Sequence, residues 1–134
     1  MLWCPAVERH LLTTAGVLGF LAVALGAFGA HGLQKMLAGV EEAQRRMQWW
    51  QTGASYHLAH ALALAMAAWL AGRGAGSAAT VAGGSFAGGV LRFSGSLYCM
   101  ALGGPRWLGA VTPVGGLLFL AGWSAVVVAA LRLR

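Results

Sequence analysis

Four long apolar runs occupy most of this chain, and no other feature restricts its fold so strongly. Each reaches about 20 residues, the length of helix that crosses the ~30 Å hydrocarbon core of a bilayer. Inside lipid every backbone group needs an internal partner, and the runs lack the alternation typical of strands, so each is expected to form a helix. The predicted spans are residues 11–30, 53–72, 78–102 and 112–131.

The links between the runs predict how these helices are arranged. Residues 73–77 and 103–111 are short connections, and short connections make successive helices antiparallel neighbours. We therefore expect one all-α membrane domain over residues 1–134, with four transmembrane helices in an antiparallel bundle.

The longer connection carries a helical pattern of its own. Between residues 33 and 50, apolar residues recur at three- and four-residue steps: Leu33, Met36, Leu37, Val40, Ala43, Met47 and Trp50. Glu41 precedes Arg45 by four residues and Glu42 precedes Arg46 by four, a favourable spacing on a helix surface. The pattern predicts an amphipathic helix between the first and second spans. It would lie on the bilayer surface or cap the bundle.

Charge is sparse and scattered, which excludes some classes of function. Only 9% of the residues are charged, against about 25% in soluble domains. The net charge of +6 comes from basic residues dispersed around the apolar runs, so the lipid bilayer is an expected partner and nucleic acid is not. The basic residues divide equally between the two sides, which leaves the positive-inside rule undecided. We expect both termini to be cytoplasmic.

Small residues form stripes on the first and third predicted helices, and such stripes allow helices to approach closely in lipid. On the first helix the stripe comprises Gly16, Gly19, Ala22, Gly26 and Gly29. On the third it comprises Gly84, Gly88, Arg92, Gly95 or Ser96, and Cys99. The second stripe predicts that Arg92 faces another helix and not lipid.

Three histidines lie inside or at the edge of the spans. His31 is expected to end the first helix, where an imidazole can cap free carbonyls. His57 and His60 share a helix face and could hydrogen-bond to another helix, bind haem, a quinone or a metal, or relay protons. The spans contain no Asp or Glu, which excludes a di-iron carboxylate site, and zinc normally needs three or four ligands. We therefore assign no residue as a metal ligand, and a haem, quinone or metal site stays open as an alternative.

Arg92 is the least expected residue in the third span. An arginine at the centre of a membrane helix costs about 2.5–3.5 kcal/mol on insertion scales. The acidic residues of the chain, Glu8, Glu41 and Glu42, all lie outside the spans. Arg92 must therefore use backbone carbonyls or nearby hydroxyls, reach a lipid phosphate, or meet an anion that belongs to another molecule.

Several segments carry a family resemblance: GAFGAH at 26–31, QTG at 51–53 with Tyr56 and His60, FSGSLYCMAL at 93–102, and TPVGGLLFLAGW at 112–123. Together, and over essentially the whole chain, they resemble the uncharacterised YgdD-type family of small bacterial inner-membrane proteins. The resemblance implies a four-helix inner-membrane protein with cytoplasmic termini, and it implies no activity. His57 and Arg92 depart from the family pattern. The departure at His57 weighs against a two-histidine metal site as the family's function, and that at Arg92 suggests a feature particular to this protein, such as its own partner.

Two classes of function follow from these features. The favoured one is a non-enzymatic accessory or scaffold subunit that packs against partner membrane proteins or lipid, so no catalytic residue is predicted. The alternative is a haem-, quinone- or metal-binding subunit of a redox assembly. The candidate polar site comprises His31, Tyr56, His60, Ser96 and Tyr98. Arg92 is the candidate contact to a partner or anion.

Overall fold

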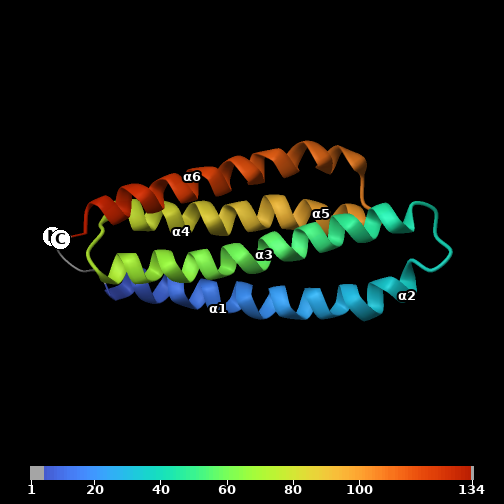
Figure 1. Ribbon diagram of the computed structural model, residues 1–134, viewed down its shortest axis with the longest axis horizontal. Coiled ribbons are helices and arrows are strands. Elements are labelled where there is room, and N and C mark those ends of the chain that lie inside the picture. Colours follow the sequence, from blue (N-terminus) through green and yellow to red (C-terminus); the bar gives the residue numbers. More distant parts are fainter. Residues whose placement is uncertain (1–4, 134) are drawn as a thin grey trace.

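The computed structural model describes residues 5–133, which form four helical segments lying side by side along the long axis (Figure 1). The first segment comprises α1 (Pro5–Phe28), the π-helical turn η1 (Gly29–Leu33) and α2 (Gln34–Met36). The second is α3 (Ala43–Gly72). The third comprises α4 (Ser77–Gly89), the π-helical turn η2 (Val90–Ser94) and α5 (Gly95–Ala101). The fourth comprises the 3₁₀ turn η3 (Arg106–Ala110) and α6 (Val111–Leu131).

Within the described residues, three helices are long and apolar enough to cross a membrane: Pro5–Met36, Ala43–Gly72 and Arg106–Leu131. The third segment is less apolar because glycine, serine and Arg92 interrupt it. It is also an inner segment, since α4 packs along both α3 and α6. Its buried positions are held largely by small residues, such as Ala79, Ala82 and Ser94. Such residues lower the hydropathy of a helix while they allow its neighbours to approach closely.

The prediction of one amphipathic helix over residues 33–50 is wrong. The chain leaves the helical path after Met36 and turns, with Gly39 at a φ of 76° and Glu42 at a φ of 59°, before α3 begins at Ala43. Leu33 and Trp50, which we assigned to one apolar face, instead lie on two different segments and pack together with Ala101. Leu33, Leu37 and Trp50 of this pattern are buried on two segments joined by a turn, whereas Met36 and Val40 are exposed.

The ion pairs at this turn also differ from the expected ones. Glu42 pairs with Arg45 at 2.9 Å and with Arg106, which lies far away in sequence. Arg46 instead donates from Nε to the carbonyl of Ala101 at 2.7 Å. Glu42 is the N-cap of α3 and has a left-handed backbone, so its side chain does not leave the chain as it would from within a helix, where the four-residue spacing makes side chains neighbours.

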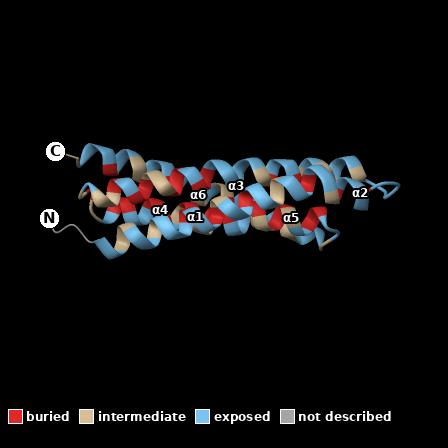
Figure 2. Ribbon diagram, turned by 90° about the horizontal axis from the view of Figure 1, so that it is seen from below, coloured by how far each residue is buried: buried red, intermediate tan, exposed pale blue. Residues whose placement is uncertain are grey.

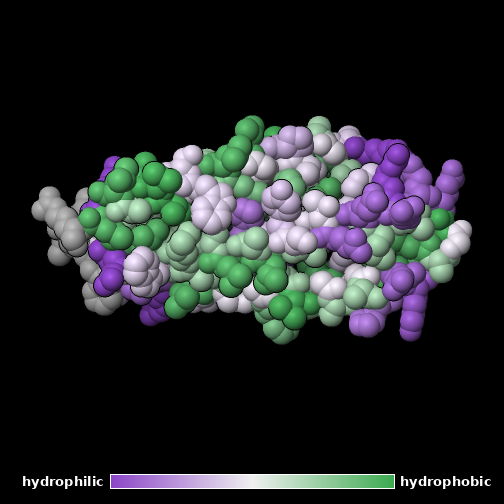
Figure 3. Space-filling view, viewed as in Figure 1, coloured by the Kyte–Doolittle hydropathy of each residue, from purple (hydrophilic) through white to green (hydrophobic). Residues whose placement is uncertain are grey.

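The molecule has a narrow buried interior and an apolar exterior. Figure 2 shows the buried residues as strips along the inner faces of the helices, while large apolar side chains such as Phe20 and Leu62 are exposed. In Figure 3, hydrophilic side chains gather toward the end that carries the turn between α2 and α3. An apolar exterior with polar ends is the arrangement that a bilayer requires and that water disfavours.

Glycines determine how closely α6 approaches the third segment. A Cβ on Gly115 would lie 2.7 Å from the Cα atom of Phe93, and one on Gly122 would lie 2.6 Å from the ring of Phe86. The stripe predicted on the first helix is only partly used. Gly29 meets the ring of Trp50, whereas a Cβ on Gly16, Gly19 or Gly26 would have no described neighbour within 4 Å.

Candidate functional site

His60 has a hydrogen-bond partner at each of its ring nitrogens, and one of these partners joins α3 to α6. Its Nδ1 lies 2.7 Å from the carbonyl oxygen of Tyr56, and Trp123 donates from Nε1 to His60 Nε2 at 3.2 Å. Because a carbonyl can only accept and an indole N–H can only donate, these contacts fit the neutral ring with its proton on Nδ1. The ring also stacks on Phe119, with 3.6 Å between the ring centroids. His60 is therefore held in one tautomer and one orientation.

His57, one turn earlier on α3, contacts a different segment. Its Nδ1 lies 3.1 Å from the hydroxyl oxygen of Tyr98 on α5. Its Nε2 is buried and has no hydrogen-bond partner among the described residues, although the backbone of Leu18 on α1 is close to the ring. His57 thus lies where α1, α3 and α5 meet, while His60 faces α6.

Two serines of the third segment form further contacts between helices. The hydroxyl of Ser94 is completely buried and donates to the carbonyl of Gly53 on α3 at 2.7 Å. The hydroxyl of Ser96 lies 2.6 Å from that of Thr112 on α6 and 2.9 Å from the carbonyl of Phe93. Such bonds between membrane helices contribute about 0.6 kcal/mol on average and up to about 1.7 kcal/mol.

The candidate site residues do not form one cluster. His60, Tyr56 and Ser96 lie around α6 and its aromatic neighbours, and Tyr98 contacts His57. His31 lies apart from them. It is exposed in η1, two residues after Gly29, and Gly29 packs against Trp50. Because Trp50 and His60 are ten residues apart on α3, about 15 Å of helix separates the two levels.

The predicted capping role of His31 is also wrong. The first segment continues past His31 through η1 to Met36, so the carbonyls of that turn are not free helix ends. The imidazole of His31 makes no hydrogen bond to any residue in the described part of the chain. The apolar positions Leu33 and Leu37, which are buried against α3, explain why the helix extends this far.

Arg92 points away from the helix packing, contrary to the prediction. It is exposed in η2, and its Nη1 lies 3.4 Å from the carbonyl of Gly88, one turn earlier on the same segment. The buried side of this segment carries Phe86, Val90, Ser94 and Leu97 instead. Glycines along the opposite side misled the prediction, because Gly84 has open space where a Cβ would be.

Sequence reasoning missed Trp50 as an interior anchor. Its ring is 2% exposed, packs against Tyr98 and Phe28, and donates from Nε1 to the carbonyl of Leu25 at 2.9 Å. The apolar pattern of residues 33–50 assigned Trp50 to the face of a surface or capping helix and not to the interior. One feature of the sequence distinguishes Trp50 from an interfacial tryptophan. It lies three residues from two positions that also face the interior, Met47 and Gly53.

The arrangement favours holding helices together over binding a metal or haem. Both nitrogens of His60 are engaged, so ligation of iron by this residue would break either its bond within α3 to Tyr56 or its interhelical bond to Trp123. Within residues 5–133, no group of three or more His, Cys, Asp or Glu side chains is placed to hold a metal ion. What these side chains can do in this geometry is fix the mutual positions of the four segments.

The Ser94 contact leads to a testable prediction. Replacing Ser94 by alanine leaves the Gly53 carbonyl without this donor and should lower the free energy of unfolding by about 1 kcal/mol. The measurement is unfolding of purified protein in mixtures of SDS and a mild detergent. Ser124→Ala is the matched control, because the exposed hydroxyl of Ser124 bonds within its own helix, to Leu120. Equal losses in the two variants would show that the Ser94 contact does not stabilise the fold.

Three apolar helices in the described region, an apolar exterior and polar groups paired between segments define a small multi-pass membrane protein. The chain belongs to the family described as "Protein of unknown function (DUF423)", whose model matches residues 25–116. The resemblance to the YgdD-type family and the expected inner-membrane location are thereby confirmed.

Similar proteins occur in several bacteria. The "UPF0382 inner membrane protein YgdD" of Escherichia coli strain K12 is 44% identical over 127 residues, covering 95% of this chain and 93% of the relative. The "UPF0382 membrane protein YwdK" of Bacillus subtilis strain 168 is 43% identical over 113 residues, covering 84% and 88%. A "UPF0382 membrane protein" of Staphylococcus epidermidis is 39% identical over 117 residues. No solved structure matches the chain.

Proposed function

We propose that the protein crosses the membrane four times as an antiparallel bundle and acts, without catalysis, as an accessory subunit of a larger membrane assembly. In this proposal Ser77–Ala101, the third segment along the chain, also crosses the membrane, in addition to the three long apolar helices. Its inner position between α3 and α6 supports this, because an inner helix meets other helices more than lipid and needs fewer large apolar residues. We place both termini in the cytoplasm.

The observation that carries the proposal is the outward position of Arg92. Nine residues, or about 14 Å of helix, separate Arg92 from the end of α5 at Ala101. At that depth an exposed guanidinium with a 3.4 Å contact to its own helix is poorly compensated. A carboxylate on a neighbouring membrane protein would compensate it.

The interior polar groups support a structural role by contrast. His60, Ser94 and Ser96 use their hydrogen-bonding groups within the bundle. Arg92 is the charged side chain of the third segment and points outward. The bundle itself therefore resembles a rigid scaffold that presents one cation to its surroundings.

Purification from native membranes tests this role. We expect a partner to co-purify with the tagged chain in a fixed ratio, and Arg92→Leu to reduce its recovery at least tenfold. Arg92→Lys should retain part of it, because the charge remains. Lys35→Leu is the matched control, since it removes an exposed cation at the end of the first segment.

The identity of the partner makes the test specific. The partner should contain a carboxylate within a membrane span, and photo-crosslinking from position 91, whose side chain is exposed beside Arg92, should reach that span. Removal of that carboxylate should abolish the effect of Arg92→Leu. If Arg92→Leu leaves recovery and the crosslink unchanged, the proposed role of Arg92 is wrong.

A further inference from the structure

Two hollows meet at the end of the molecule where α5, η3 and the start of α3 come together. One is an apolar groove of about 510 Å³, whose walls include Phe93, Leu97 and Pro113. The other is a more polar cleft of about 430 Å³, whose walls include Glu42 and Arg46. Both volumes lie in the range of about 300–1,000 Å³ that is typical of small-molecule sites.

The two hollows share a wall made of Trp49, Met100 and Arg106. The apolar groove extends from this shared wall along α5 to Phe93. Because seven residues separate Phe93 from Met100, its length along the helix is about 10 Å. The combined cavity is thus apolar toward the middle of the segment and charged at its end.

The charged end presents two guanidinium groups. Arg46 uses Nε to bond the carbonyl of Ala101, and its Nη2 faces Gly103, where a Cβ would lie only 3.1 Å away. Arg106 pairs with Glu42, which also pairs with Arg45. The cleft is lined by two arginines and by two glutamates, Glu41 and Glu42. Arg45 lies beside the cleft and pairs with Glu42, so with this third arginine the basic groups outnumber the acidic ones by one, which suits an anion. Guanidinium groups bind phosphate oxygens through paired N–H donors.

Aromatic residues place this end at a membrane surface. Trp49 lines both hollows, and Trp107 is exposed immediately after Arg106. Tryptophan is enriched at the level of lipid headgroups, where arginines also meet phosphates. The order of apolar groove, tryptophan and arginine therefore follows the order of acyl chain, glycerol region and phosphate in a phospholipid.

We propose that the joined groove and cleft bind one anionic phospholipid, with an acyl chain along α5 between Trp49 and Phe93 and the phosphate between Arg46 and Arg106. Bound phosphate displaces Glu42 from Arg106, and Glu42 keeps its pair with Arg45. The site lies on a different part of the molecule from Arg92 and does not depend on a protein partner.

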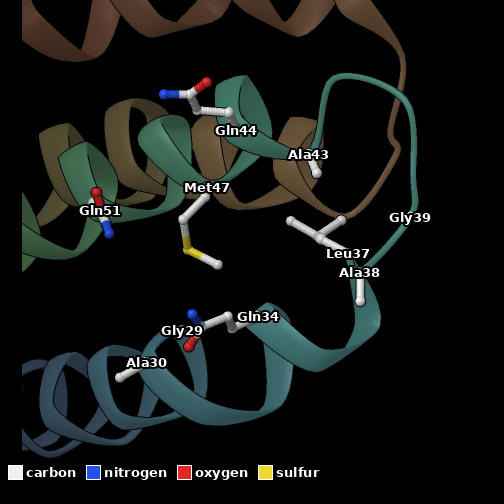
Figure 4. A pocket seen from close by; sticks show the side chains of 10 residues that line it. All are labelled: Gly29, Ala30, Gln34, Leu37, Ala38, Gly39, Ala43, Gln44, Met47 and Gln51. Atoms are coloured by element: carbon white, nitrogen blue, oxygen red, sulfur yellow. The ribbon is translucent and has the colours of Figure 1, made fainter.

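Another hollow serves as an internal comparison. It has about 370 Å³ and lies between the end of the first segment and the start of α3, with Met47 projecting into it (Figure 4). Its polar lining consists of the uncharged side chains Gln34, Gln44 and Gln51. A charged headgroup gains no ion pair there, so this hollow does not share the predicted preference.

The test measures lipid retention by native mass spectrometry on purified protein. Phosphatidylglycerol and phosphatidylcholine are added in parallel at equal concentration, and inorganic phosphate is then added to the lipid-bound protein as a competitor. We expect the protein to retain one phosphatidylglycerol at least tenfold better than phosphatidylcholine. Arg106→Gln should remove most of this preference. Arg73→Gln, which alters an exposed arginine at the opposite end, should leave it unchanged.

A second variant tests the apolar half without altering charge. Gly109 lines the groove, and a Cβ added there would lie 3.8 Å from its nearest neighbour, the Sδ atom of Met100. Gly109→Leu should therefore fill the groove and still fold. It should lower retention of phosphatidylglycerol at least fivefold, with an unchanged circular dichroism spectrum. Equal retention of the two lipids by the unaltered protein would overturn the proposal. So would a preference that survives both variants, or displacement of the lipid by inorganic phosphate, which would indicate a plain anion site.

Discussion

Replacing Gly115 by alanine should push α6 away from the third segment and lower the free energy of unfolding by about 3 kcal/mol. The added Cβ would lie 2.7 Å from both Cα and Cβ of Phe93. The obstacle includes backbone, which no rotamer change can move, so the helix itself must shift. Such a shift would also disturb the Ser96–Thr112 contact three residues away. Unfolding in SDS and detergent mixtures measures the loss.

Gly116→Ala is the control for this prediction. It makes the same chemical change on the same helix, one residue later, where a Cβ would find its nearest neighbour, the ring of Phe93, at 3.9 Å. Helix propensity alone favours alanine over glycine by about 1 kcal/mol at both positions. We therefore expect Gly116→Ala to be neutral or stabilising. If both variants were equally stable, the close approach of α6 at Gly115 would be wrong.

Replacing Trp50 by alanine should have a comparable or larger effect, a loss of about 3–5 kcal/mol. The ring is almost completely buried where the end of α1, α3 and α5 meet, and it contacts Phe28, Tyr98 and Gly29. Its removal leaves a cavity and takes the indole donor away from the carbonyl of Leu25. Lipid supplies little hydrophobic drive between helices, so the loss comes mainly from packing contacts.

Two further variants separate the contributions of Trp50. Trp50→Phe keeps much of the ring and removes the bond to Leu25, so it should cost about 1 kcal/mol beyond its change in volume. Trp107→Ala removes an exposed tryptophan at the same end of the molecule and should change stability by less than about 0.5 kcal/mol. Equal losses for Trp50→Ala and Trp107→Ala would contradict the interior position of Trp50.

The helical segments could be predicted because each depends on neighbours in the sequence. The ends predicted at residues 72 and 131 are those of α3 and α6, and the start predicted at residue 112 is within one residue of that of α6. The start predicted at residue 53 is wrong, because α3 begins at Ala43. The turn at residues 37–42 could not be predicted in the same way. The helical spacing of Leu33, Leu37 and Trp50 is the same whether they line one helix or the inner faces of two. Only their packing with Ala101 in the tertiary structure distinguishes the two arrangements.

The sequence predicted which residue types form the candidate site, but it did not predict their hydrogen-bond partners. A histidine or serine in an apolar run must find a polar partner, which is why His60 and Ser96 stood out. Their partners, Trp123 and Thr112, lie 63 and 16 residues away, and spacing along one helix carries no information on such pairs. Arg92 shows the reverse error, since a stripe of glycines indicated contact on a side of the segment that is exposed.

By itself the sequence determined that this is a helical membrane protein, because apolar length and backbone hydrogen bonding in lipid are local properties. It also determined the family to which the chain belongs. Only the tertiary structure decided which side of each helix is buried, that His60 joins α3 to α6, and that Arg92 faces outward. The physical reason is that lipid and a neighbouring helix are similarly apolar. Hydrophobicity alone therefore cannot orient a membrane helix, and close packing and paired polar groups must do so.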